Sequence, residues 1–281
     1  MMTESSSFSF DGKILYERDS VYHHISIIQS DSDLCMLFGR YQDQRETCIS
    51  LFDPDMPVLE YTAMMFVGLL YKPETENVAL FGLGGGYIPS IFRKYLPHIE
   101  MHVIEIDPMV FKLAKKYFGF EVSNNINLTI ADGRQYLKRT TKLFDQIWLD
   151  AFNSDYIPTH MTTKEFFLVA KSRLKVNGIV VANIHNDSKL FDAQVLTIRS
   201  VFQHVYIYNG NESRNSIIVA SDNPTSTHEK ILGQITRFNG KIGKIDLSVQ
   251  GKKYSPNVSI TPMKILTDDY NPANLWLHKK R

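Results

Sequence analysis

The chain has 281 residues, 43% of them hydrophobic and 22% charged, which is ordinary for a globular protein. Its formal net charge is +1 and it has no apolar run of membrane-spanning length, so we expect neither a nucleic-acid partner nor a membrane. The first residues lack a basic segment followed by an apolar one, so we expect no signal peptide and a cytoplasmic location.

Residues 1–58 form short runs in which apolar and polar residues alternate, a pattern typical of β-strands. The runs are FSFDGKILYE, VYHHISIIQS and LCMLFGRY, and Asp11-Gly12 is a hairpin signal within the first. We expect a small antiparallel sheet. The segment holds both cysteines, Cys35 and Cys48, too few for a disulfide framework or a zinc site. We expect reduced thiols in the core, with a Cys35–Cys48 bridge as the alternative.

Residues 59–225 alternate between helical and strand patterns after an apolar helix, VLEYTAMMFVGLLY, that Pro73 ends. The expected strands are NVALFGLG, MHVIEID, INLTIAD, FDQIWLDAF and NGIVVANI, with helices between them. Strands that alternate with helices predict a parallel sheet. The last two strands, HVYIYN and NSIIVAS, are joined by a short polar loop and must pair antiparallel.

A parallel sheet that ends in an antiparallel hairpin is the layout of class I S-adenosylmethionine-dependent methyltransferases. We therefore predict this Rossmann-like α/β fold with a small N-terminal antiparallel β domain. The expected parts are an N-terminal β-strand domain over 1–58, a nucleoside-binding catalytic domain over 59–225, and a C-terminal extension over 226–281 packed on it. In the extension we expect a helix from His228 to about Phe238 and then extended structure.

Four glycines, Gly82, Gly84, Gly85 and Gly86, lie between the first of these strands and the following helix. Glycines let the backbone adopt positive φ and approach a ligand closely. The helix behind them offers free N–H groups and the positive end of its dipole. The order of strand, loop and helix predicts a nucleoside site, and the alternative is a tight turn without a ligand.

Carboxylates follow the next three strands and should meet the glycine loop at one edge of the sheet. Glu105 comes about 20 residues after the glycines, the spacing of a carboxylate that binds ribose hydroxyls. Asp107 lies beside it. Asp132, followed by Gly133, is expected to accept a hydrogen bond from an adenine amino group. Asp150 ends the fourth strand, where it would face the reacting end of the ligand. The alternative for Glu105, Asp107 and Asp132 is helix capping.

In this order the motifs resemble the spermidine synthase (polyamine aminopropyltransferase) family, particularly its spermidine-synthase-like members, over nearly the whole chain. The residues that carry the resemblance are Ser20-Val21-Tyr22, Gln44, Tyr61, GLGGG, VIEID, Ala131-Asp132-Gly133, FDQIWLDAF with Pro158 and the EFF helix, and the late LTDDYNP segment.

The resemblance implies a transferase that moves an aminopropyl group from decarboxylated S-adenosylmethionine to an amine, without a metal. It implies that Asp150 is the catalytic aspartate, which helps to deprotonate the attacking amine. It places Gln44 with the nucleoside. It also implies a homodimer that pairs through the N-terminal sheet. The residues expected in the acceptor pocket are Tyr22, Tyr61, Asp155, Asp268 and Asp269.

The chain departs from the family pattern on the acceptor side. The family reads GGGDGG in the loop, whereas Gly85 stands near the place of that aspartate, and Tyr61-Thr62-Ala63 replaces Tyr-Gln-Glu. Two alternatives follow. One is a methyltransferase that uses intact S-adenosylmethionine, because a loop without the acidic group admits the methionine carboxylate. The other is a nucleoside-binding protein without catalysis, since a fold alone does not fix function.

Overall fold

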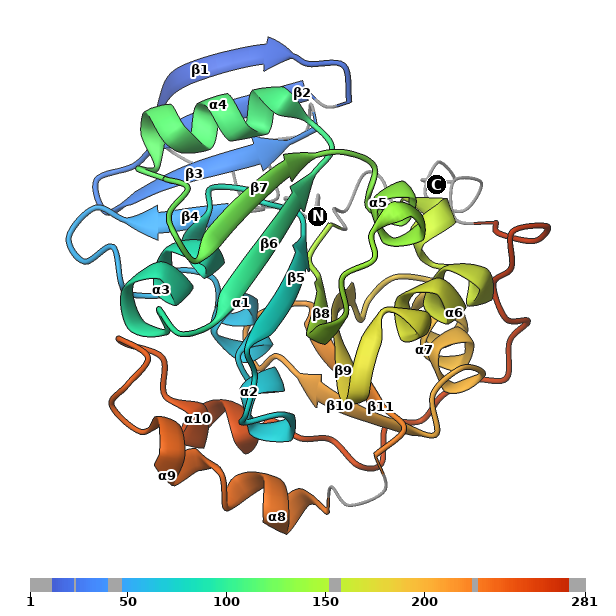
Figure 1. Ribbon diagram of the computed structural model, residues 1–281. Coiled ribbons are helices and arrows are strands. Elements are labelled where there is room, and N and C mark those ends of the chain that lie inside the picture. Colours follow the sequence, from blue (N-terminus) through green and yellow to red (C-terminus); the bar gives the residue numbers. More distant parts are fainter. Residues whose placement is uncertain (1–11, 23, 40–46, 152–157, 224–226, 273–281) are drawn as a thin grey trace, which may run out of the picture.

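The computed structural model describes residues 12–22, 24–39, 47–151, 158–223 and 227–272, which form two sheets (Figure 1). Gln44 and Asp155, both predicted for the site, lie outside the described residues. Within the described ranges, no helix is long and apolar enough to cross a membrane.

The N-terminal sheet has four antiparallel strands in the order β1-β2-β3-β4. They are β1 (Lys13–Asp19), β2 (His24–Gln29), β3 (Asp33–Phe38) and β4 (Thr47–Ser50). The predicted small antiparallel sheet is confirmed. Strand β4 was not predicted, because its four residues are too few to show a period.

The two cysteines lie directly opposite each other on β3 and β4 and form a disulfide. The Cα atoms of Cys35 and Cys48 are 4.1 Å apart, as expected for facing residues of an antiparallel pair. The prediction of reduced thiols is therefore wrong and its alternative is correct. The pairing could not be deduced without β4, since only the register of β3 on β4 brings the two residues together.

The second sheet has seven strands in the order β10-β11-β9-β8-β5-β6-β7. Neighbours from β9 to β7 pair parallel, while β11 runs antiparallel to both β9 and β10. The strands are β5 (Asn77–Phe81), β6 (Glu100–Glu105), β7 (Ile126–Ile130), β8 (Phe144–Leu149), β9 (Leu174–His185), β10 (His204–Asn209) and β11 (Asn215–Ser221). This is the predicted class I methyltransferase-like fold.

Helices cover both faces of this sheet (Figure 1). Along β5, Val78 and Leu80 enter one hydrophobic core, and Ala79 and Phe81 enter the other, as the two-residue period of a strand requires. The helices between the strands are α3 (Tyr87–Tyr95), α4 (Pro108–Tyr117), α5 (Gly133–Arg139), α6 (Lys164–Ser172) and α7 (Phe191–Arg199), with a 3₁₀ helix, η1 (Thr159–Met161), before α6. The five α-helices occur about where the sequence predicts them, whereas η1 was not predicted. Buried strands between two helical layers explain the apolar runs.

Two predicted helices are divided in the structure. The helix before Pro73 becomes α1 (Glu60–Met65) and α2 (Gly68–Tyr71), joined by N–H groups that bond to carbonyls three residues back. The C-terminal helix becomes α8 (His228–Leu232) and α9 (Ile235–Phe238). A further helix, α10 (Leu247–Gly251), occupies part of the segment predicted to be extended, so that prediction is wrong for these residues.

Candidate active site

A cavity of about 340 Å³ opens at the carboxyl edge of the seven-stranded sheet, with residues of the N-terminal sheet in its lining. Most of the predicted site residues line it, namely Tyr22, Tyr61, Gly82, Gly84, Glu105, Asp132, Gly133 and Asp150. They come together because the parallel strands β5, β6, β7 and β8 all end at this edge.

The glycine loop forms the floor where β5 meets α3. Gly82 has φ of +97°, and a Cβ there would lie 2.2 Å from the carbonyl oxygen of Asp150. The two strand ends therefore approach more closely than any side chain allows. Gly85 and Gly86 face the packing behind the loop, since a Cβ on either would meet Phe118 or Phe120.

Glu105 links the end of β6 to the glycine loop. Its Oε2 accepts a hydrogen bond from the N–H of Leu83 at 3.0 Å, and its Oε1 accepts one from the N–H of Asp107 at 2.8 Å. Burial raises the pKa of the Glu105 carboxyl to about 7, although both N–H groups oppose the rise. Glu105 lines the cavity, and its contact with ribose hydroxyls stays a prediction.

Asp107 is buried beside Glu105 but does not line the cavity among the described residues. Its Oδ1 accepts from the N–H of Met109 and caps α4, and its Oδ2 accepts from the hydroxyl of Ser20. The capping alternative therefore accounts for Asp107, which also holds the N-terminal sheet on α4.

Asp132 caps α5 and also pairs with a histidine that we did not predict. Its Oδ1 accepts from the N–H of Gln135 at 2.8 Å, and its Oδ2 lies 2.6 Å from Nε2 of His160 on η1. Asp132 and His160 both line the cavity. Gly133 follows Asp132, where a Cβ would lie 2.6 Å from the ring of Phe81.

Asp150 follows β8, next to the glycine loop, and lines the cavity. Its Oδ1 accepts a hydrogen bond of 2.9 Å from the side-chain amide of Asn183 on β9. The Asn183 oxygen in turn accepts one of 2.8 Å from Asn215 on β11. Burial raises the pKa of Asp150 to about 7, opposed by the Asn183 hydrogen bond. The carboxyl group is thus oriented by two buried amides and titrates near neutral pH.

Two of the predicted acceptor residues lie elsewhere. Asp268 forms an ion pair with Arg134, and neither Asp268 nor Asp269 lines the cavity among the described residues. Tyr22, half exposed, and Tyr61, buried on α1, do line it. Among the described residues, no group of three or more histidine, cysteine or carboxylate side chains is arranged to hold a metal ion.

Comparison with known proteins identifies the family. A sequence profile of the spermine/spermidine synthase domain matches residues 59–210. A polyamine aminopropyltransferase of Vibrio vulnificus is 31% identical over 287 aligned positions, covering 98% of this chain and 95% of that protein. The chain belongs to the spermine/spermidine synthase family. This membership confirms the predicted family and the predicted class of enzyme, a spermidine-synthase-like transferase.

Two further comparisons are more distant. Spermidine synthase from Thermotoga maritima shares the fold with a TM-score of 0.70 at 21% identity, covering 87% of this chain and 85% of that one. An eEF1A lysine and N-terminal methyltransferase of Danio rerio is 27% identical over 150 residues, covering 48% of this chain and 21% of that protein. The first comparison shows the shared fold, and the second shows sequence similarity to a methyltransferase over about half of this chain.

Three residues of the site were missed in the sequence. Asn183 is an amide within the apolar run from Ile179 to Ile184 of β9, and this interruption was a usable signal. His160 had no local signal, because its partner Asp132 is 28 residues away. Thr47 lies on the unpredicted β4, where its hydroxyl accepts from the N–H of Gly85 at 3.2 Å and joins the N-terminal sheet to the loop.

Proposed function

We propose that this protein transfers an aminopropyl group from decarboxylated S-adenosylmethionine to an amine. The observation that carries the proposal is Asp150, a carboxyl group with a pKa of about 7 that lines the cavity beside the glycine loop in a member of this family. The acceptor is written as an amine because the acceptor side departs from the family pattern.

The donor nucleoside is held by residues at the edge of the sheet. Glu105 binds the ribose hydroxyls, Asp132 accepts a hydrogen bond from the adenine amino group, and the backbone at Gly82 and Gly84 faces the sulfonium chain. All four residues line one cavity, which supports this assignment. Above about pH 7, where both carboxyl groups are mostly ionised, Glu105 and Asp150 also attract the cationic donor.

In the reaction the amine nitrogen bonds to the propyl carbon next to sulfur as the carbon–sulfur bond breaks. The sulfur keeps the electron pair of that bond, so the sulfonium becomes the neutral thioether of methylthioadenosine. The amine must first lose a proton, because aliphatic amines have pKa values of about 10. Asp150 accepts this proton, and Asn183 keeps its carboxylate oriented toward the cavity.

Mass spectrometry of the purified protein with decarboxylated S-adenosylmethionine and a pool of mono- and diamines tests the proposal. We expect methylthioadenosine and one aminopropylated amine in equal amounts. The Asp150→Asn variant should lose about 10²–10⁴-fold in kcat while binding methylthioadenosine like the wild type, because only the proton acceptor is removed.

A parallel reaction with intact S-adenosylmethionine separates the alternatives. S-adenosylhomocysteine formed from the intact donor alone would replace the proposal with methyl transfer, which the methyltransferase relative makes a specific rival. Binding of methylthioadenosine without turnover of any amine would favour a protein that has lost catalysis.

The proposal includes a homodimer paired through the N-terminal sheet and a cytoplasmic location. Light scattering of the purified chain tests the dimer, for which the expected mass is twice the 32.3 kDa of one chain. A single-chain mass at micromolar concentration would exclude it.

A further inference from the structure

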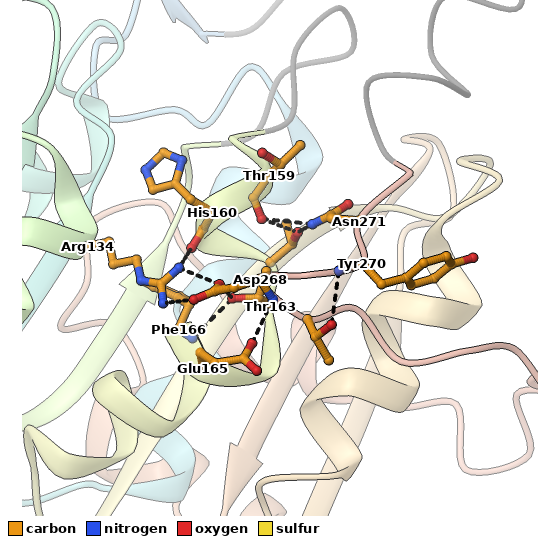
Figure 2. Close-up of polar contacts among 11 residues, drawn as sticks. Arg134, Thr159, His160, Thr163, Glu165, Phe166, Asp268, Tyr270 and Asn271 are labelled. Carbon is orange, nitrogen blue, oxygen red and sulfur yellow. Dashed lines mark hydrogen bonds and ion pairs between the residues drawn. The ribbon is translucent and has the colours of Figure 1, made fainter.

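A segment near the C-terminus, Leu266–Asn271, is fastened to the elements beside the nucleoside site (Figure 2). Both oxygens of Asp268 accept hydrogen bonds of 2.6 Å from the two terminal nitrogens of Arg134. Oδ1 also accepts from the hydroxyl of Thr163 at 2.8 Å, and the N–H of Asp268 donates to Glu165 at 3.0 Å. One carboxylate thus joins α5 to the start of α6.

Other contacts of the segment hold the same region. The side-chain amide of Asn271 donates to the carbonyl of Thr159 and to the hydroxyl of Thr162, each at 2.8 Å. The carbonyl of Leu266, which is fully buried, accepts from the N–H of Lys164 at 2.9 Å. The segment therefore fixes both η1 and the first turn of α6.

The contacts continue from Arg134 into the cavity. Arg134 lies two residues after Asp132, and its Nη1 donates to the carbonyl oxygen of His160 at 3.1 Å. Figure 2 shows this carbonyl directed at Arg134 while the imidazole ring of His160 points away from the cluster. The ring nitrogen Nε2 lies 2.6 Å from Oδ2 of Asp132. Asp268 is thereby connected to the carboxylate expected to recognise adenine, although Asp268 itself does not line the cavity.

We propose that Asp268, acting through Arg134, is a positioning residue that holds His160 against Asp132 and so sets how selectively the site binds adenine. The inference rests on the proposed binding of an adenine nucleoside. The Arg134 side chain is only 9% exposed, and a nearly buried guanidinium needs a carboxylate partner. Without Asp268, Arg134 must move toward water, which releases the backbone of His160 and with it the geometry around Asp132.

The test compares two nucleosides that differ at the atom Asp132 would contact. Methylthioadenosine carries an amino group that donates to a carboxylate, whereas methylthioinosine carries a carbonyl oxygen that is repelled by it. Calorimetry should show that the wild type prefers methylthioadenosine by about 10- to 100-fold, since a hydrogen bond to a charged group contributes about 1.5–3 kcal/mol. The Asp268→Asn variant should reduce this preference at least fivefold, and Asp268→Glu should restore part of it.

Asp222→Asn is the matched control. Asp222 pairs at 2.5 Å with Lys171 of α6, the helix that Asp268 also contacts. The side chain of Asp222 is 39% exposed, against 43% for Asp268. Asp222 follows β11 and lies at the edge of the sheet opposite to the cavity. We expect its nucleoside preference to equal that of the wild type. Thermal unfolding of every variant shows whether binding is compared between folded proteins. If Asp268→Asn does not fold, the nucleoside preference of Asp268→Glu is compared with that of the wild type instead.

The outcomes are distinct. A lower preference in Asp268→Asn, with the control unchanged, supports the positioning role. An unchanged preference, whether or not both affinities fall together, overturns that role and leaves the proposed function intact. A wild-type protein that binds neither nucleoside overturns the proposed function and, with it, this inference.

Discussion

Asp150 is a partly exposed residue of the cavity wall, and the pKa of about 7 of its carboxyl group lies within the working range of most enzymes. Because burial raises this pKa, the group is protonated below pH 7 and can accept a proton only above it. We expect kcat/KM to rise with pH through about 7 as Asp150 ionises. The hydrogen bond from Asn183 favours the ionised form and keeps the pKa from rising further.

Replacing Asn183 should therefore move the pH profile. In the Asn183→Leu variant the ionised carboxylate loses its donor, so we predict that the acidic limb of kcat/KM shifts to higher pH by about one unit, which corresponds to about 1.4 kcal/mol. Asn127→Ala is the control, because Asn127 donates to Glu100 at 2.9 Å on the surface and should leave the limb in place. A limb that keeps its position while kcat falls would mean that Asn183 only supports packing.

The strand-end carboxylates could be predicted because of the geometry of parallel sheets. Glu105, Asp132 and Asp150 each follow an apolar run, and the ends of such runs must share one edge. The partners of these carboxylates depend on contacts between distant segments and left no local pattern. The partner of Asp268 could not be predicted for the same reason. The resemblance suggested that Asp268 contacts the substrate, whereas in the structure it pairs with Arg134.

At the scale of the element, the glycine loop leaves no space for a side chain at Gly82. We predict that Gly82→Ala lowers the free energy of unfolding more than Gly119→Ala does, and that the two losses differ by at least about 2 kcal/mol. The reason is that backbone atoms of Asp150 cannot move aside for a Cβ at Gly82. Gly119 is the matched control, with φ of +68° and no heavy atom within 4 Å of the place that a Cβ would occupy, so only conformational strain of about 1–2 kcal/mol applies. Urea denaturation measures the free energy of unfolding of both variants. Equal losses of stability would refute the close approach of Gly82 to Asp150.

Strands β3 and β4 are joined by the disulfide next to Thr47, the residue that contacts the glycine loop. We predict that reductant lowers the free energy of unfolding by about 2–4 kcal/mol, because the bridge restricts the unfolded chain. The Cys35→Ala/Cys48→Ala variant should not respond to reductant. Alkylation of the unfolded, unreduced protein should label no thiol. Two labelled thiols would contradict the prediction of a bridge. Because disulfides are rare in the cytoplasm, a bridge found in protein taken directly from cells would count against the proposed cytoplasmic location.

At the scale of the element, long apolar or amphipathic runs were predictable and short ones were not. Strand β5 and the middle of β9 lie between helical layers and therefore contain the continuous apolar runs VALF and IVVA. Strand β4 and helix α10 have four and five residues, fewer than the patterns need to repeat. Their positions are determined by packing against the rest of the molecule.

At the scale of the whole molecule, Glu60 joins three distant parts of the chain. From the start of α1 its carboxylate accepts hydrogen bonds from the N–H groups of Asn211, Glu212 and Ser213 in the turn between β10 and β11. It also accepts one from Lys253, which follows α10 in the C-terminal extension. The extension is thereby attached next to Tyr61, a residue of the cavity wall.

This arrangement makes stability depend on pH in a defined direction. Burial alone would raise the pKa of Glu60, but Lys253 and the three N–H groups outweigh it and lower the pKa to about 2 from 4.5. A group with a lowered pKa contributes stability that is complete above the unfolded value and is lost as pH falls through the folded one. The contribution of Glu60 is therefore present at pH 7 and disappears between about pH 4.5 and 2.

We predict that Glu60→Gln lowers the free energy of unfolding by about 1–2 kcal/mol at pH 7, allowing for solvent screening, and by progressively less below pH 4.5. Urea denaturation at pH values from about 7 down to about 3.5 measures the difference. Glu121→Gln is the control, because Glu121 is 65% exposed in its pair with Arg93 and should change stability little at any of these values. A loss for Glu60→Gln that is the same at every pH would mean that its charge is not what holds the three segments together.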